Sequence, residues 1–192
     1  MQQLILASQS PSRKFILDQA GFVFEVDVSG YEEDMTLSMT PAELAKHLSL
    51  GKAEAVAARR QNGVVLAADS FGHLNGQLFG KPHTTEKAKE MLRTLSGQTH
   101  TFVTGFTVID LASDQKHNEA VETRITFKKL SPEEIDFYLA EEDVLEKAGA
   151  YSILGKGRGL VAHVEGSVAN AGGLPIERVT EVLAEFGVQP QT

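Results

Sequence analysis

The sequence predicts an α/β fold built on a mixed, twisted sheet with flanking helices. Apolar stretches typical of strands recur along the chain, for example at residues 64–69 and 99–110. Helix-start signals lie between such stretches, at Pro11, at Thr40-Pro41 and at Ser131-Pro132. Because strands and helices mix without strict β-α-β alternation, we expect a mixed sheet rather than a purely parallel one.

The composition indicates a globular chain with one sizeable core. The 192 residues are 42% hydrophobic and 23% charged, which predicts a single domain over 1–192, undivided or split into two lobes by a cleft, with no linker. A net charge of −8 argues against nucleic-acid binding, and the absence of cysteine excludes disulfides and thiol nucleophiles. No apolar run reaches the roughly 18 residues of a membrane span, and residues 4–7 are too short for a signal peptide. We therefore expect a cytoplasmic location and no membrane partner.

The individual elements follow from local signals. Capping residues, glycine stops and alternating hydrophobicity delimit most segments, and Asn75-Gly76 is typical of a type I′ hairpin turn. The expected helices are 11–20, 41–60, 85–95, 132–141 and a last one ending at 186; the expected strands are 4–7, 22–28, 64–69, 71–74, 77–79, 99–110, 121–129 and 160–164.

The junction between the first strand and the first helix has the character of an anion site. Ser8, Ser10, Ser12 and Arg13 crowd a point where free N–H groups and the positive end of a helix dipole converge. A Ser-Pro helix start is also common without any ligand. A cation in the first turn is unfavourable for the helix dipole, so Arg13 favours an anion partner.

Asp69 and two lysines are further candidates. We expect Asp69 at the carboxyl end of a buried strand, where it could hold a divalent metal, activate water, or simply cap the next turn. Lys81 lies between Gly80 and Pro82, which restrict its backbone. Lys52 is expected on a helix, where lysines are usually solvated.

The acidic segment with Glu32, Glu33 and Asp34 could supply oxygen ligands to Mg²⁺ or Mn²⁺, or serve only solubility. The six histidines show no metal-ligand spacing, and the glycines of residues 155–159 lack the context of a phosphate loop. These residue types suit metal-assisted phosphoanhydride chemistry. In such chemistry cations bind the phosphates, carboxylates hold the metal, and one carboxylate orients the attacking water.

Six blocks of the sequence resemble the Maf family in order and spacing. They are LASQSPSRKFIL near the start, GKAEAVA around Lys52, AADS to GKP from Ala67 to Pro82, LSGQTHTFVTG from Leu95 to Gly105, KAGAY from Lys147 to Tyr151, and GLP from Gly173 to Pro175. The resemblance implies a fold similar to that of the inosine triphosphate pyrophosphatases, with two lobes around a cleft and often a homodimer.

The same resemblance implies an activity. A nucleoside triphosphate and water would give the monophosphate and pyrophosphate, with Mg²⁺ or Mn²⁺ as cofactor, and the substrates could be modified or non-standard nucleotides. Asp69 matches the residue that accepts the proton from water. Ser8, Arg13, Lys52 and Lys81 match substrate-binding positions, and Glu33 matches an acidic position that could share the metal with Asp69.

Three positions linked to base choice depart from the family's patterns. The dTTP/UTP branch has Arg, Thr and Gln where this chain has Ser12, Ser70 and Leu154, and the 7-methyl-GTP branch has Trp, Gln and Glu. Leu154 lacks an amide that could read a base edge by hydrogen bonding. The base is therefore left open, and a nucleotide-binding regulator linked to cell division, with weak or no catalysis, is the alternative function.

Overall fold

A seven-stranded mixed sheet forms the centre of the protein in a computed structural model that describes residues 2–191. The strand order is β2-β1-β3-β5-β6-β7, and β4 pairs with the far end of β3. β1 runs parallel to β2 and β3, and all other pairs are antiparallel, which confirms the predicted fold class. The strands are β1 Leu4–Leu6, β2 Phe24–Val26, β3 Val64–Leu74, β4 Gln77–Phe79, β5 Thr99–Asp110, β6 Lys116–Phe127 and β7 Val161–Glu165.

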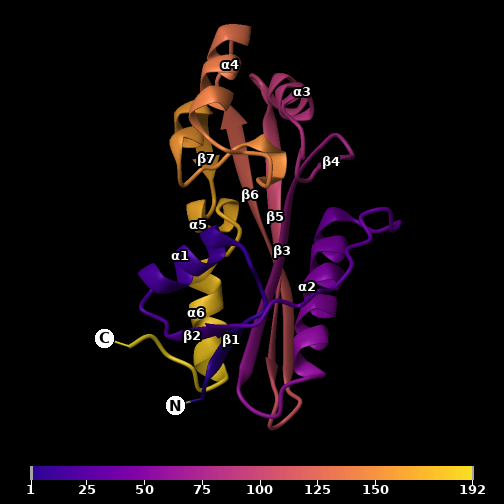
Figure 1. The fold of residues 1–192 in the computed structure, drawn as a ribbon, viewed down its shortest axis with the longest axis vertical. Helices are drawn as coiled ribbons and strands as arrows, with labels where there is room; N and C mark the ends of the chain where they lie inside the picture. The colour runs from indigo at the N-terminus through magenta and orange to yellow at the C-terminus, as the bar shows by residue number, and fades with distance from the viewer. Residues whose placement is uncertain (1, 192) are drawn as a thin grey trace.

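Helices flank this sheet on both faces. Figure 1 shows α2 on one side of the long strands, α1 and α6 on the other side, and α3 and α4 at the far end. The helices are α1 Pro11–Gln19, α2 Pro41–Ala57, α3 Thr85–Leu95, α4 Pro132–Glu141, α5 Val168–Ala171 and α6 Ile176–Glu185, with 3₁₀ turns η1 Ala148–Ala150 and η2 Lys156–Leu160. Between residues 2 and 191, no helix is long and apolar enough to cross a membrane.

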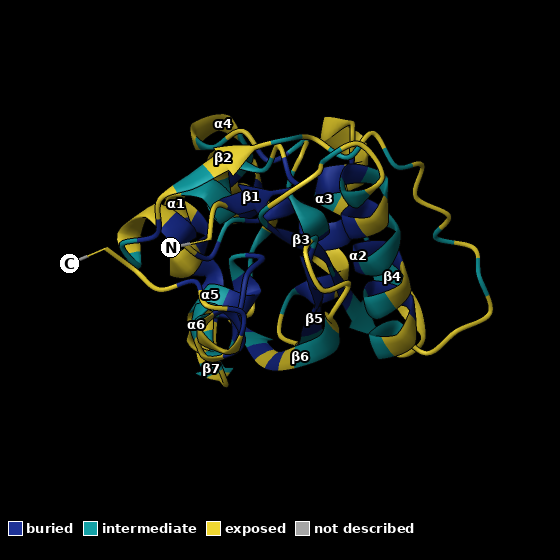
Figure 2. Ribbon diagram, turned by 90° about the horizontal axis from the view of Figure 1, so that it is seen from below, coloured by how far each residue is buried: buried dark blue, intermediate teal, exposed yellow. Residues whose placement is uncertain are grey.

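Separate hydrophobic cores fill the two ends of the molecule. At one end, buried side chains of α3, α4 and the outer parts of β5 and β6 surround Phe127. At the other end, β1 and the first half of β3 pack against α1 and α6 on one face, while α2 covers the opposite face further along the strands. Figure 2 shows these buried residues concentrated between the helices and the sheet. The long strands β3, β5 and β6 run from one core to the other.

The strand expected to end at Asp69 continues to Leu74. Its ladder with β5 is unbroken from Val64 to His73, so the backbone stays extended beyond Asp69. On the other edge of β3, β1 pairs only with residues 64–66 and β4 only with residues 72–74. Asp69 and Ser70 therefore lie in a gap between two partner strands, rather than at a strand end.

Other boundaries differ where pairing overrides local patterns. β2 is limited to Phe24–Val26, because it pairs only with the three residues of β1. β6 begins at Lys116 instead of 121, because residues 116–120 already pair with β5. α2 ends at Ala57 rather than 60. The predicted turn at Asn75-Gly76 is confirmed, with φ of 50° and 83°.

A glycine sets how closely α2 approaches the sheet. Gly105 pairs with Asp69 across the β3–β5 ladder. A Cβ at Gly105 would lie 2.2 Å from the carbonyl carbon and oxygen of Ala45 on α2. Only a residue without a side chain permits this contact, which holds α2 directly over the middle of the long strands.

A buried histidine lies in the core beneath α3 and α4. His100 is 2% exposed, and its ring makes edge contacts with Phe127 and Tyr151. Its Nε2 lies 2.9 Å from the hydroxyl of Tyr151. Burial, with a smaller contribution from His73, lowers the pKa of His100 to about 4.

Replacing Gly105 with alanine is expected to destabilise the fold. The new methyl group must displace the backbone of α2, and overpacking of this kind costs about 3 kcal/mol. For a chain of this size the melting temperature should fall by roughly 6–12 °C in a thermal unfolding experiment. Gly159→Ala is the matched control, because a Cβ there meets nothing within 4 Å. Equal melting temperatures for both variants would contradict the assigned contact.

The stability of the protein is expected to fall with acidification through His100. The unfolded chain takes up the proton near pH 6.5 and the folded protein only near 4, so the unfolded state binds more protons between these values. The free energy of unfolding should drop by about 2 kcal/mol between pH 7 and pH 5 from this group alone. Urea titrations at both pH values should show a smaller drop for His100→Gln. His47→Gln, at an exposed position, should behave like the wild type.

Candidate active site

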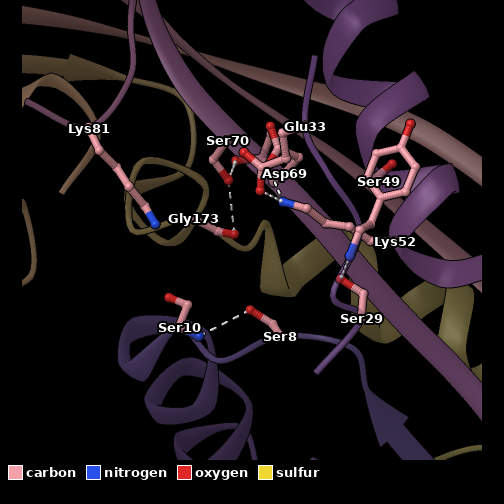
Figure 3. A network of polar contacts seen from close by, with 12 residues as sticks. Ser8, Ser10, Ser29, Glu33, Ser49, Lys52, Asp69, Ser70, Lys81 and Gly173 are labelled. Atoms are coloured by element: carbon pink, nitrogen blue, oxygen red, sulfur yellow. Dashed lines mark hydrogen bonds and ion pairs between the residues drawn. The ribbon is translucent and has the colours of Figure 1, made fainter. Parts of the chain in front are cut away.

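Side chains from five separate segments meet beside the gap in the edge of β3. Ser8 follows β1, Lys52 lies on α2, Asp69 and Ser70 lie on β3, and Lys81 follows β4 (Figure 3). Arg13 from α1 completes the group through hydrogen bonds with Ser8 and Ser70. The structure therefore brings together cations, carboxylates and hydroxyls that the sequence spreads over 74 positions, from 8 to 81.

A buried ion pair lies at the centre of this group. The Nζ of Lys52 donates a hydrogen bond to Oδ1 of Asp69 and lies 2.7 Å from Oε1 of Glu33. Lys52 and Asp69 are 8% and 6% exposed, whereas Glu33 remains largely exposed. Lys52 departs from the usual solvation of helix lysines, because its side chain extends under the acidic loop and toward β3. Such a pair requires both partners, since an isolated buried charge is strongly unfavourable.

The acidic loop is anchored so that Glu33 reaches this pair. Gly51 lies inside α2, where glycine is normally unfavourable by about 1 kcal/mol. A Cβ at that position would lie 2.4 Å from Cζ of Tyr31, so the aromatic ring occupies the surface of the helix at this point. Asp34 instead bonds to Thr36 within the loop, and only Glu33 of the three predicted carboxylates pairs with Lys52.

The guanidinium of Arg13 is held by three neutral oxygens. Its Nε donates to the carbonyl of Gly173 at 2.9 Å, Nη1 to Ser8 Oγ at 3.2 Å and Nη2 to Ser70 Oγ at 2.9 Å. Burial lowers the pKa of Arg13, and the charges of Asp69 and Glu33 oppose that shift. Within residues 2–191 no carboxylate forms an ion pair with Arg13. Its positive charge is therefore oriented but not neutralised by direct contact.

The start of α1 confirms the predicted helix cap. Ser10 Oγ accepts a hydrogen bond from the backbone N–H of Arg13, and Ser8 Oγ accepts one from the N–H of Ser10 (Figure 3). Pro11 occupies the first helical position. The hydroxyls thus order the backbone of the junction and, through Ser8, the guanidinium of Arg13.

Lys81 occupies the opposite side of the group. Its side chain is exposed and extends toward the same space as the other labelled residues in Figure 3. Its ammonium pairs with Glu146 at 3.0 Å, and the contact lowers the pKa of Glu146. An exposed pair of this kind contributes little to stability, so Lys81 can exchange Glu146 for another anion.

The three positions that the family resemblance links to base choice lie in different surroundings. Ser70 accepts from Arg13 and lies 3.3 Å from the Gly173 carbonyl. Leu154 is 41% exposed and rests on Gly172, where a Cβ would lie 2.7 Å from its Cδ1. Ser12 is partly buried in the first turn of α1. Ser70 and Leu154 therefore border the same turn at residues 172–173.

The carboxylates present fit a single hard cation. Asp69 and Glu33 both contact one ammonium, so their oxygens converge on a common point. Mg²⁺ is usually bound by one or two carboxylates together with substrate phosphates. No cluster of three or more His, Cys, Asp or Glu residues that could hold a metal occurs in the described part of the chain. The donor set therefore suits a metal that arrives with a phosphate-bearing ligand.

Sequence reasoning missed several residues that shape this group. Gly173 supplies a carbonyl to Arg13 and has a φ of 103°, which glycine alone adopts readily. The Gly172-Gly173 pair was a visible signal of an unusual turn. Glu146 and Tyr31 gave no signal, because neither an exposed acid nor a loop tyrosine stands out by spacing.

Comparisons with known proteins match nearly the whole chain. The family model described as Maf-like protein matches residues 3–186. A protein named dTTP/UTP pyrophosphatase from Bacillus cereus is 41% identical over 188 residues, covering 98% of this chain and 97% of that protein. One of the same name from Methanococcoides burtonii is 41% identical over 189 residues, covering 98% and 97%.

A solved structure shares the fold. The Staphylococcus aureus Ham1 protein aligns with a TM-score of 0.51 at 15% identity, over 96% of this chain and 99% of that one. This likeness concerns the fold alone. The family model spans nearly the whole chain, and the relatives far exceed the similarity that unrelated sequences show. The chain belongs to the Maf family.

Proposed function

We propose that this protein is a nucleoside triphosphate pyrophosphatase, a hydrolase that acts on a phosphoric anhydride. The observation that carries the proposal is the buried Lys52–Asp69 pair beside the same gap in β3 as the guanidinium of Arg13, with which no carboxylate of residues 2–191 forms an ion pair. The names of the relatives at 41% identity point to the same reaction. A carboxylate that can accept a proton from water, placed near cations that stabilise developing negative charge, suits water attack on a polyphosphate.

The reaction breaks one anhydride bond. The oxygen of water forms a bond to the α-phosphorus, the bond from that phosphorus to the bridging oxygen breaks, and pyrophosphate leaves with the bonding electrons. Asp69 accepts the proton of the attacking water at Oδ2, which accepts no hydrogen bond from residues 2–191. Lys52 holds Oδ1 and thereby fixes the direction of the carboxylate.

The three cations bind different oxygens of the phosphate chain. Arg13 presents a planar fork of donors that matches phosphate oxygens, while Lys52 and Lys81 act as point charges. Ser8 binds through its hydroxyl and orients Arg13 at the same time. Lys81 would leave Glu146 when a more highly charged phosphate binds.

Glu33 and Asp69 would hold Mg²⁺ or Mn²⁺. Such a metal supplies Lewis-acid polarisation of phosphate oxygens and charge neutralisation when bound. Glu33 contributes an exposed carboxylate on an anchored loop, so it can turn from Lys52 to a cation without disturbing the core.

The choice of nucleobase is a separate question from the reaction. The relatives are named for dTTP and UTP, but Leu154 offers only apolar contact where an amide would read a base edge. We infer broader base selectivity, which could extend to modified nucleotides. Pyrophosphate release from a panel of standard and modified triphosphates tests this directly. Nucleotide binding without turnover on any of them would favour the regulatory alternative.

Asp69→Asn is expected to abolish most of the activity. An amide of the same size cannot accept the proton of water, so kcat should fall about 10²–10⁴-fold while KM changes little. Steady-state pyrophosphate release measures both constants. Asp110→Asn is the matched control, because Asp110 is another buried carboxylate whose partners are Ser113 and Ala112. A kcat for Asp69→Asn within twofold of the wild type would contradict the role of Asp69.

Glu33→Gln is expected to weaken metal activation. After removal of divalent cations with a chelator, activity should return with Mg²⁺ or Mn²⁺, and half-activation should require about tenfold more metal in the variant. Glu32→Gln, one residue away in the same loop, should match the wild type. Full activity of the chelated wild type, or identical metal titrations for Glu33→Gln, would overturn the assigned metal site.

A further inference from the structure

Thr104 is a buried residue of β5 that lies directly opposite Ser70 of β3. It is 0% exposed, and its register partner in the ladder is Ser70. Its hydroxyl oxygen lies 3.1 Å from Ser70 Oγ and 3.1 Å from the carbonyl oxygen of Asn170. The single hydroxyl proton is shared between these two oxygens, so one side chain bridges the sheet and α5.

Both partners of Thr104 lead to the guanidinium of Arg13. Ser70 Oγ accepts from Nη2 of Arg13 at 2.9 Å. Asn170 precedes the turn whose Gly173 carbonyl accepts from Nε at 2.9 Å. Ser70 and Gly173 are themselves 3.3 Å apart, which is the contact drawn between them in Figure 3. Thr104 thus supports two of the three acceptors that orient Arg13.

The same network fixes α5 against the sheet. Nδ2 of Asn170, which is fully buried, donates to Thr123 Oγ1 at 3.0 Å and to the carbonyl of Phe102 at 3.3 Å. α5 has only four residues, so its own hydrogen bonds give it little independent stability. The position of the Gly173 carbonyl therefore depends on these buried contacts.

The network and the ion pair occupy opposite faces of β3. Successive residues of a strand point to opposite faces, so Ser70 and Thr104 face α5 while Asp69 faces α2. A change at Thr104 can therefore disturb Arg13 without displacing Lys52 or Asp69. Arg13 has a long side chain whose binding strength depends on being held in one plane before the ligand arrives.

We infer that Thr104 is a positioning residue for Arg13 and thereby sets the affinity of the site for the phosphate chain. This inference rests on the proposed pyrophosphatase function for its kinetic consequence. The orientation of Arg13 that it predicts can be measured without any substrate.

The test combines nuclear magnetic resonance with kinetics on Thr104→Val and Thr104→Ser. The Nε–H signal of Arg13, identified by its loss in Arg13→Lys, should shift and exchange with water about fivefold faster in Thr104→Val. KM for UTP and dTTP should rise about fivefold with kcat within twofold of the wild type. Thr104→Ser keeps the hydroxyl and should restore both the signal and KM.

Thr107→Val is the matched control. Thr107 is an equally buried threonine on the same strand, and its hydroxyl contacts Ser49 and Asn118 instead. The Thr107→Val variant should lose comparable stability but retain the wild-type Nε–H signal and KM.

An unchanged Arg13 signal in Thr104→Val, or an equal rise of KM in Thr107→Val, overturns the inference. Failure of the wild type to hydrolyse any triphosphate would refute the proposed function, while the resonance measurement would still decide the role of Thr104.

Discussion

The contact between α2 and β5 at Gly105 is the constraint on which the candidate site depends. At this position no side chain fits between the two elements, so the helix backbone lies directly against the strand. This brings Lys52, seven residues after Ala45, to the level of Asp69 on the neighbouring strand. The ammonium is thereby removed from water, and its favourable state requires the carboxylate it meets there.

A second constraint comes from the interrupted edge of β3. The pairing of β1 with β3 ends at Leu66, and the pairing of β4 with β3 begins at Gly72. Between these points one edge of β3 has no partner strand. The chain leaving β1 enters α1 beside this gap and delivers Ser8 and Arg13 to it. One strand can then present Asp69 to the ion pair and Ser70 to the guanidinium, because adjacent residues point to opposite faces.

The two cationic groups are stabilised by different physical means. Lys52 is held by two carboxylates, which fix the position of its ammonium group but also pair with its charge. Arg13 is held by a carbonyl and two hydroxyls, which orient it without cancelling its charge. The ion pairs of Lys52 suit a group that orients a carboxylate. The neutral partners of Arg13 suit a group whose charge remains available to bind an anion. This difference between the surroundings of Lys52 and Arg13 supports the proposed reaction more specifically than the number of charges alone.

The sequence by itself determined the fold class, the helix caps, the hairpin turn at Asn75-Gly76 and the family, because these depend on local chemistry or on residue order. It also predicted the start of α1 as a polar junction, since Ser10 and Pro11 are neighbours in the chain. Only the tertiary structure decided that β3 continues past Asp69, because that extension depends on pairing with a strand about 35 residues away. Likewise, the burial of Lys52 and the three oxygens around Arg13 arise from segments up to 160 residues apart, and no local pattern encodes contacts over such separations.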